Sequence, residues 1–152
     1  MSNLLVQNIK HTNNTTSMAI DTSGQVSIRG EGSATTTNLQ QGLAKQWCNF
    51  VGSSASVNDS FNTASVTDNG TGDFSPQITN DMSGVHYNVS CIIKPKSSQS
   101  NQTLGRVGNL RYNESPSAGG YRVITVTCAD NSGTVGPEDN DMTMTTVHGD
   151  LA

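Results

Sequence analysis

VHYNVSCIIK, residues 85–94, is the stretch that decides the fold, because its apolar side chains recur at every second position. Each odd-numbered position from 85 to 93 carries Val, Tyr, Cys or Ile, whereas the even-numbered positions carry polar residues and Ile92. A period of two residues is that of a β-strand with one buried face. Residues 121–128 (YRVITVTC) are apolar on parts of both faces, which predicts a strand at the centre of a sheet.

Shorter strand-like runs lie on both sides of these two stretches and are separated by clusters of Gly, Asn, Asp and Ser. They cover residues 47–51, 60–66, 74–79, 104–112 and 142–147. The Asn69-Gly70 pair between two of these runs predicts a hairpin turn. Short strands at regular spacing with such turns predict an all-β fold, an antiparallel β-sandwich of jelly-roll-like type.

The chain divides into three parts by composition. In residues 1–30, Asp21 and Gly24 stand at the first and fourth positions of a type I turn, so we expect a β-hairpin arm for attachment or oligomerisation. Residues 31–42 are rich in Gly, Ser, Thr, Asn and Gln, which predicts a linker with room for a short helical turn at its end. Residues 43–152 form the predicted sandwich domain.

The composition predicts a thin core. Hydrophobic residues make up 32% of the 152 residues and charged residues 13%, while Ser, Thr, Asn and Gln together number 61. Long amphipathic helices are disfavoured by only 3 Glu and 4 Lys. Because a monomer of this size has to bury most of its unfolded surface, we expect oligomerisation to share that burial among sister copies.

Charge and hydropathy exclude several classes of partner. The net charge of −4 provides no basic surface for phosphate contacts, so no nucleic-acid partner is expected. No apolar run is long enough for a membrane span, so no membrane insertion is expected. The first ten residues lack a secretory signal pattern, and the three cysteines (Cys48, Cys91 and Cys128) are interpreted as reduced thiols.

Catalytic patterns are missing from the sequence, which predicts a protein that is not an enzyme. The three histidines belong to no metal-binding motif, and most Asp residues stand in turn contexts such as Asp68-Asn69-Gly70, where they cap the backbone. The acidic group at residues 138–141 lacks the spacing of a calcium loop. We therefore expect no catalytic residue, no metal site and no cofactor.

The seven aromatic residues supply the candidate ligand-binding residues. Most of them are expected in the core because so few are present, and this group includes Trp47, Phe50, Phe61, Phe74 and Tyr87. Tyr112 and Tyr121 flank a loop rich in Gly, Ser and Pro, where an exposed ring beside Asn113 can stack on a sugar. Tyr112, Asn113 and Tyr121 are therefore the predicted ligand-binding residues.

Three segments carry a resemblance to a known family. Residues 42–50 (GLAKQWCNF), 58–62 (NDSFN) and 66–74 (VTDNGTGDF), followed by Met82 and Tyr87, resemble a recurring module of tail-fibre-like structural proteins of marine tailed bacteriophages. Residues 4–28 are more weakly similar to the attachment stretch of such proteins. Residues 51–54 (VGSS) depart from the Gly-Thr-Gly that the family tends to carry there, and residues 95–152 match no motif of it.

The resemblance implies a virion structural protein of the tail-fibre or appendage type, made in the host cytoplasm. Such proteins are often homotrimers that bind other virion proteins and are thought to recognise host surfaces, which implies contact with surface glycans. A capsid decoration protein on the phage head, using the same sandwich, is the alternative hypothesis. An enzyme that acts on polysaccharide is the third.

Overall fold

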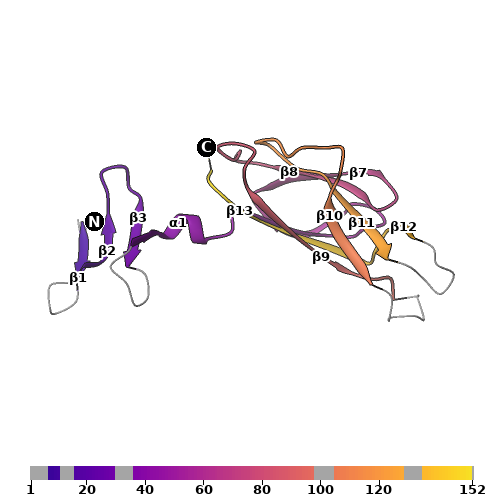
Figure 1. Cartoon of the computed structure of the whole chain (residues 1–152), viewed down its shortest axis with the longest axis horizontal. Helices are drawn as coiled ribbons and strands as arrows, with labels where there is room; N and C mark the ends of the chain where they lie inside the picture. Colours follow the sequence, from indigo (N-terminus) through magenta and orange to yellow (C-terminus); the bar gives the residue numbers. More distant parts are fainter. Residues whose placement is uncertain (1–6, 11–15, 30–35, 98–104, 129–134, 152) are drawn as a thin grey trace. The chain divides into compact units, whose positions relative to one another are not determined.

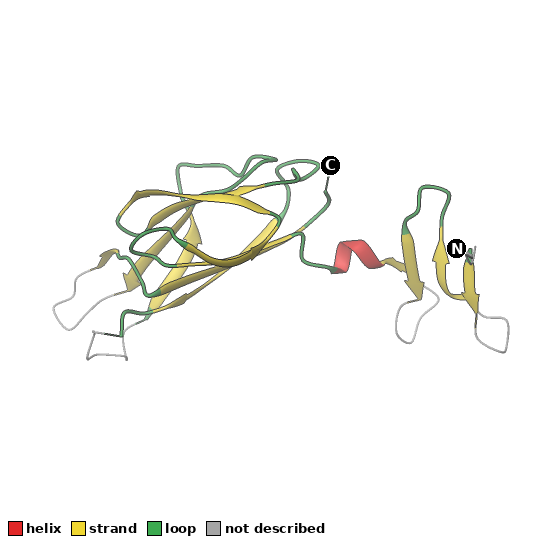
Figure 2. Ribbon diagram, turned by 180° about the vertical axis from the view of Figure 1, so that it is seen from behind, coloured by secondary structure: helices red, strands yellow, loops and turns green. Residues whose placement is uncertain are grey.

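The computed structural model describes residues 7–10, 16–29, 36–97, 105–128 and 135–151. The chain separates into two compact units, residues 1–43 and 44–152, which are described in turn. Figure 1 shows the strands of both units, and the secondary structure is almost entirely β-strand (Figure 2).

The first unit is a four-stranded antiparallel sheet in the order β1-β2-β3-β4. Its strands are β1 (Asn8–Lys10), β2 (Thr16–Ile20), β3 (Val26–Arg29) and β4 (Thr36–Asn38), followed by the short helix α1 (Leu39–Gly42). The β2–β3 hairpin is confirmed: Asp21 accepts from the backbone N–H groups of Ser23 and Gln25, and Gly24 takes a φ of 79°. Residues 36–38 of the predicted linker form β4, because they pair with β3, and α1 is the short helical turn expected at the end of the linker.

The first sheet of the second unit has the order β6-β5-β13-β9. It consists of β5 (Gln46–Phe50), β6 (Val57–Phe61), β9 (Asn88–Lys94) and β13 (Met142–His148). Exposure alternates along β13, where Thr143, Thr145 and Val147 are buried and the residues between them are half-buried. The period-two prediction for residues 85–94 is confirmed on β9, where Ile92 lies on the exposed face.

The second sheet has the order β10-β11-β8-β7, with β12 also paired to β11. Its strands are β7 (Thr63–Gly70), β8 (Asp73–Ile78), β10 (Arg106–Leu110), β11 (Val123–Cys128) and β12 (Val135–Pro137). As predicted, β11 lies inside its sheet, and its first three residues are buried. The all-β antiparallel sandwich is confirmed by the two sheets; the jelly-roll variant stays a prediction.

The core lies between the two sheets and contains few large apolar groups. Phe50 of β5 and Phe74 of β8 meet edge to face with ring centroids 5.1 Å apart, and Val123 and Val147 are fully buried beside them. Polar side chains share this interior, among them Gln46, Thr125, Thr143 and Thr145. The thin core predicted from composition is therefore supplemented by buried polar groups.

One corner joins the two sheets. The sequence predicts one continuous strand over residues 60–66, but the structure divides it into β6 and β7 at Asn62, which has a φ of 54°. The left-handed conformation turns the chain from one sheet into the other, and Asn tolerates it better than most residues. The predicted single strand is therefore wrong at this position.

Candidate functional site

Tyr112 and Asn113 occupy the middle of a tight turn that leads out of β10. The Glu114 N–H donates to the Arg111 carbonyl at 3.1 Å, which closes the turn, and the Arg111 N–H donates to the Arg122 carbonyl at 2.9 Å, which fixes its base. The Tyr112 side chain is 80% exposed, more than any other large apolar residue of the described chain, and Asn113 is exposed beside it. The structure thus brings these two predicted residues together at the surface.

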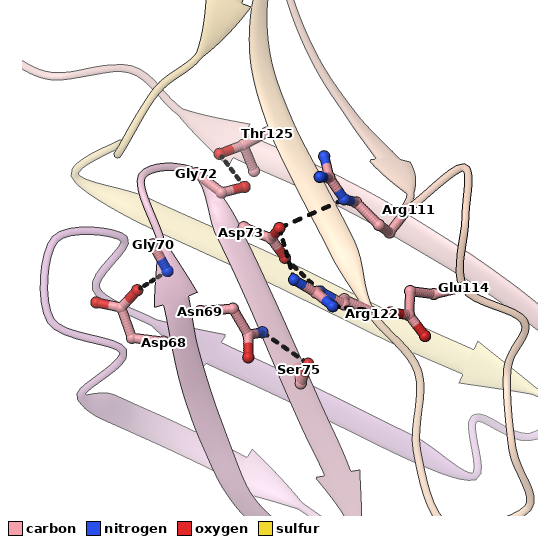
Figure 3. Close-up of polar contacts among 10 residues, drawn as sticks. All are labelled: Asp68, Asn69, Gly70, Gly72, Asp73, Ser75, Arg111, Glu114, Arg122 and Thr125. Atoms are coloured by element: carbon pink, nitrogen blue, oxygen red, sulfur yellow. Dashed lines mark hydrogen bonds and ion pairs between the residues drawn. The ribbon is translucent and has the colours of Figure 1, made fainter.

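The base of this turn is held by a network of two arginines and two carboxylates (Figure 3). Asp73 is buried at the start of β8, and its two oxygens accept from Arg122 Nε at 2.7 Å and Arg122 Nη2 at 3.0 Å. Arg111 Nε lies 3.4 Å from Asp73 Oδ2, and Arg122 Nη1 donates to Glu114 Oε1 at 2.9 Å. The hydrogen bond to Asp73 raises the pKa of Arg122. The bidentate pair of hydrogen bonds fixes the orientation of the Arg122 and Asp73 side chains.

The network also positions the exposed ring. The Arg111 guanidinium lies 5.2 Å from the centroid of the Tyr112 ring, within the range of a cation–π contact. Because Asp73 holds the guanidinium, the ring is supported on one side while most of it stays in contact with solvent. A supported aromatic ring beside amide and guanidinium donors can stack on the apolar face of a sugar and bond its hydroxyl groups.

Tyr121 does not belong to this surface, so the prediction of Tyr121 as a ligand-binding residue is wrong. Its side chain is 3% exposed and points into the sandwich, where its hydroxyl hydrogen-bonds with Gln46 Oε1 at 2.9 Å and with the Thr145 hydroxyl at 2.7 Å. Burial raises its pKa. Tyr112 and Tyr121 flank the same loop, so their positions in the sequence did not distinguish them. Tyr121 is buried because it lies just before β11, a strand inside its sheet.

Tyr87 has an unforeseen role in shaping the loop that follows the turn. Its hydroxyl lies 2.8 Å from the carbonyl oxygens of both Ser117 and Gly120, and its ring meets Tyr121 edge to face with centroids 6.3 Å apart. Burial raises the pKa of Tyr87 to about 12. The period-two pattern identified Tyr87 as facing inward, but no sequence signal links it to residues thirty positions away.

Acidic residues near the hairpin between β7 and β8 support the backbone, which was expected for Asp68 but not for Asp139. Asp68 Oδ1 accepts from the Gly70 N–H at 2.9 Å (Figure 3), and Asp139 Oδ1 accepts from the Gly72 N–H at 2.7 Å. Glu138 pairs with Arg106, whose side chain is 3% exposed, and also accepts from the Thr127 hydroxyl. Over the described ranges, no group of three or more His, Cys, Asp or Glu could hold a metal ion.

Two aromatic residues that were expected in the core are exposed. Trp47 is 36% exposed and Phe61 is 52% exposed, and they stand opposite each other on β5 and β6. Phe50 and Phe74, by contrast, are fully buried as predicted. The core assignment of Trp47 and Phe61 is wrong because both alternate with inward-facing neighbours: Cys48 and Gln46 fill the interior positions of β5.

Comparisons with known proteins give one structural likeness. No family model and no curated protein matches the sequence. The tailspike of phage phiAB6, solved in complex with three-repeated oligosaccharides of Acinetobacter baumannii surface polysaccharide, is similar in fold, with a TM-score of 0.51 at 9% sequence identity. The match covers 94% of this chain and 27% of that one. The chain therefore shares its fold with part of a phage tailspike, and it spans about a quarter of that protein's length.

No helix within the described residues has the length and apolar character to cross a membrane.

Proposed function

We propose that this chain is a structural protein of a bacteriophage tail appendage, oligomeric and without enzymatic activity, that contacts host surface glycans through the turn at Tyr112. The fold likeness to a phage tailspike over 94% of the chain is the observation that carries the proposal. The motifs at residues 42–74 independently resemble fibre-like virion proteins. A sandwich with a polar surface and few charges suits a protein that contacts neutral sugar hydroxyls.

The geometry around Tyr112 supports a binding role without catalysis. The exposed Tyr112 ring rests on the Arg111 guanidinium, which Asp73 holds in place, so the ring is presented in a fixed position. Asp73 and Glu114, the carboxylates nearest to the turn, are both engaged by Arg122. Retaining and inverting glycosidases need two carboxylates that face a glycosidic bond, one of them free to hold a proton. These two serve the arginine network instead.

Location on the particle is the first test of the proposal. Antibodies against the full chain, bound to intact phage and viewed by electron microscopy, are expected to label the tail. Label confined to the head would overturn the appendage role and support a capsid decoration protein.

Glycan contact is tested separately with the full chain and the surface polysaccharide of the host that the phage infects. Binding to the immobilised polysaccharide is expected to fall about tenfold in Tyr112→Ala and to be retained in Tyr112→Phe, because the ring supplies the stacking surface. Equal binding by Tyr112→Ala would remove the turn from the proposal. Release of shortened saccharide during incubation would show that the protein is an enzyme.

A further inference from the structure

A second surface, remote from Tyr112 in sequence, has the composition of a saccharide platform. This surface is the outward face of the sheet β6-β5-β13-β9, and the pairing of the strands determines which residues stand side by side on it. Phe61, Trp47, Thr146 and Ser90 stand opposite one another in a row that crosses all four strands. The next row on the same face contains Asp59, Asn49, Met144 and Ile92. We propose that this platform, centred on Trp47 and Phe61, binds a neutral oligosaccharide.

The two rings are fixed by the sheet and do not depend on a loop. Their neighbours Cys48 and Phe50 are buried, which sets the alternation of β5 and holds Trp47 outward. The Trp47 carbonyl also accepts from the Thr63 hydroxyl at 3.2 Å, which ties β5 to the adjoining strand β7. Residues directly opposite on antiparallel strands have Cβ atoms about 5 Å apart. Two rings at this spacing offer adjacent stacking positions to neighbouring sugar units.

Polar groups beside the rings supply hydrogen bonds. Thr146 and Ser90 continue the aromatic row with hydroxyl groups, and Asn49 lies two residues from Trp47 on the same face. Asn49 Oδ1 accepts from Asn58 Nδ2 at 3.1 Å, which holds the Asn49 amide in one orientation. Apolar rings next to a few fixed polar groups are the usual makeup of a carbohydrate-sized site.

The exposed apolar area favours a small ligand over a second copy of the chain. With Trp47 36% exposed and Phe61 52% exposed, the pair presents roughly 200 Å², taking about 200–250 Å² for a whole ring side chain. Ile92, 66% exposed, adds roughly 100 Å² to this. Each partner in a stable protein interface buries about 800 Å². Somewhat more than half of such an interface, roughly 450 Å² on each side, is apolar. The apolar area of these three side chains is smaller than that, although it is large enough to cover two sugar rings.

Charge narrows the class of saccharide. Asp59 is the one ionisable carboxylate in the two rows, and no Lys or Arg stands in them. The chain as a whole carries −4. Lys94, in the next row of the same face, lies 4.0 Å from Asp141, so an anionic polysaccharide would have to compete with that carboxylate and would also meet Asp59. The face therefore complements a neutral saccharide.

The single tryptophan makes the test direct, because Trp47 is the only Trp of the chain and its emission reports on this face alone. Neutral trisaccharides (cellotriose, chitotriose and maltotriose) are titrated against the full chain while the quenching of Trp47 by acrylamide is measured. At least one is expected to protect Trp47 with a Kd near 1 mM. Phe61→Ala is expected to weaken that binding about tenfold, whereas Phe61→Tyr retains it.

Tyr112→Ala is the matched control, since it removes an exposed ring from the other surface and is expected to leave Trp47 protection unchanged. Loss of protection in this variant, or full protection in Phe61→Ala, would overturn the platform. So would the absence of protection by every trisaccharide at about 10 mM. Protection that grows with protein concentration in the absence of sugar would assign the face to a second copy instead. None of these outcomes bears on the particle location or on the Tyr112 turn, which are tested by themselves.

Discussion

Gly72 illustrates how closely the backbone of the β7–β8 hairpin packs against its neighbours. It has a φ of +67°, and a Cβ added to it would lie 2.5 Å from the Thr125 carbonyl oxygen and 2.7 Å from the Glu138 nitrogen. Gly72→Ala is therefore expected to lower the free energy of unfolding by about 3 kcal/mol or more, from backbone strain together with steric overlap. Urea denaturation followed by circular dichroism measures this change.

Gly70 provides the matched control for that substitution in the same hairpin. Its φ is also positive, at +128°, but no atom lies within 4 Å of the position that a Cβ would take. Gly70→Ala is thus expected to cost only the backbone strain, about 1–2 kcal/mol. An equal loss in both variants would mean that the close approach to Thr125 contributes nothing.

The three thiols differ in burial, which predicts different reactivity. Cys48 is buried and Cys91 half-buried, and burial raises the pKa of each to about 11, whereas Cys128 is exposed. Because the thiolate is the reactive form, an aromatic disulfide reagent at about pH 8 is expected to label Cys128 first. Cys48 and Cys91 are expected to react only after denaturant is added. Rapid reaction of all three thiols in the folded protein would contradict the burial of Cys48.

The same two pKa values predict alkaline destabilisation. A thiol with its ordinary value of 9.0 loses its proton in the unfolded chain before it does so in the folded protein, where the value is about 11. The unfolded state then binds fewer protons, so the free energy of unfolding falls as pH rises from about 9 to 11. Cys91→Ala is expected to reduce that slope, as measured by denaturation at a series of pH values.

Single residues also mark how far the candidate site could be predicted from sequence. Tyr112 and Asn113 were identified because they stand in a polar loop, and the structure places both at the surface. The arginine network beneath them was not identified. Asp73 begins β8, Arg111 directly follows β10 and Arg122 directly precedes β11, so the three side chains meet only when these strands pair. Trp47 was misplaced because a scarcity of aromatic residues argues for burial on average and does not say which face of a strand each one takes.

At the scale of elements, the corner between β6 and β7 depends on the side chain of Asn62. Its Oδ1 accepts from the Asn80 N–H at 2.7 Å, and its Nδ2 donates to the Lys45 carbonyl at 2.9 Å. Asn62→Ala is expected to lower the free energy of unfolding by about 2–3 kcal/mol, because it removes these bonds and places Ala at a φ of 54°. The measurement is again denaturation of the full chain.

Asn62→Gly separates the two effects at this corner. Glycine adopts positive φ without strain, so this variant loses only the hydrogen bonds and is expected to be less destabilised than Asn62→Ala by about 1 kcal/mol. If Asn62→Gly were as stable as the natural chain, the hydrogen bonds between Asn62 and Asn80 would contribute nothing to the free energy of unfolding.

The elements that could be predicted are those whose pattern is local. The alternation in β9, the two-sided apolar pattern of β11 and the turn residues of the β2–β3 hairpin are all properties of short windows. The elements that were missed depend on partners elsewhere in the chain. The strand β4 exists by pairing with β3 and β12 by pairing with β11, and neither has an apolar period of its own. The break between β6 and β7 could not be predicted, because the residues on both sides of Asn62 have the composition of a strand.

At the scale of the whole molecule, the described residues of the first unit form no buried interior. None of its residues with a described exposure is buried, although β1, β2 and β3 carry apolar side chains in register. Ile9 pairs with Met18 and Met18 with Ile28 in one row, and Ile20 pairs with Val26 in the next. A sheet with one apolar face is stable in water only when that face is covered. We infer that sister copies cover it, which fits the oligomerisation expected from the composition.

This inference predicts a melting temperature that rises with protein concentration, since association stabilises the folded state by mass action. For the homotrimer that the resemblance to tail-fibre-like proteins implies, light scattering of the full chain is expected to give about three times the 16.0 kDa monomer mass. Ile28→Asp puts a charge on the apolar face of β3 and is expected to dissociate the oligomer, because burying an unpaired carboxylate costs several kcal/mol. Ser27→Asp, one residue earlier on the opposite face, is expected to leave it intact. A monomer at all concentrations, or equal behaviour of the two aspartate variants, would show that the apolar face of the first unit is not where copies of this chain meet.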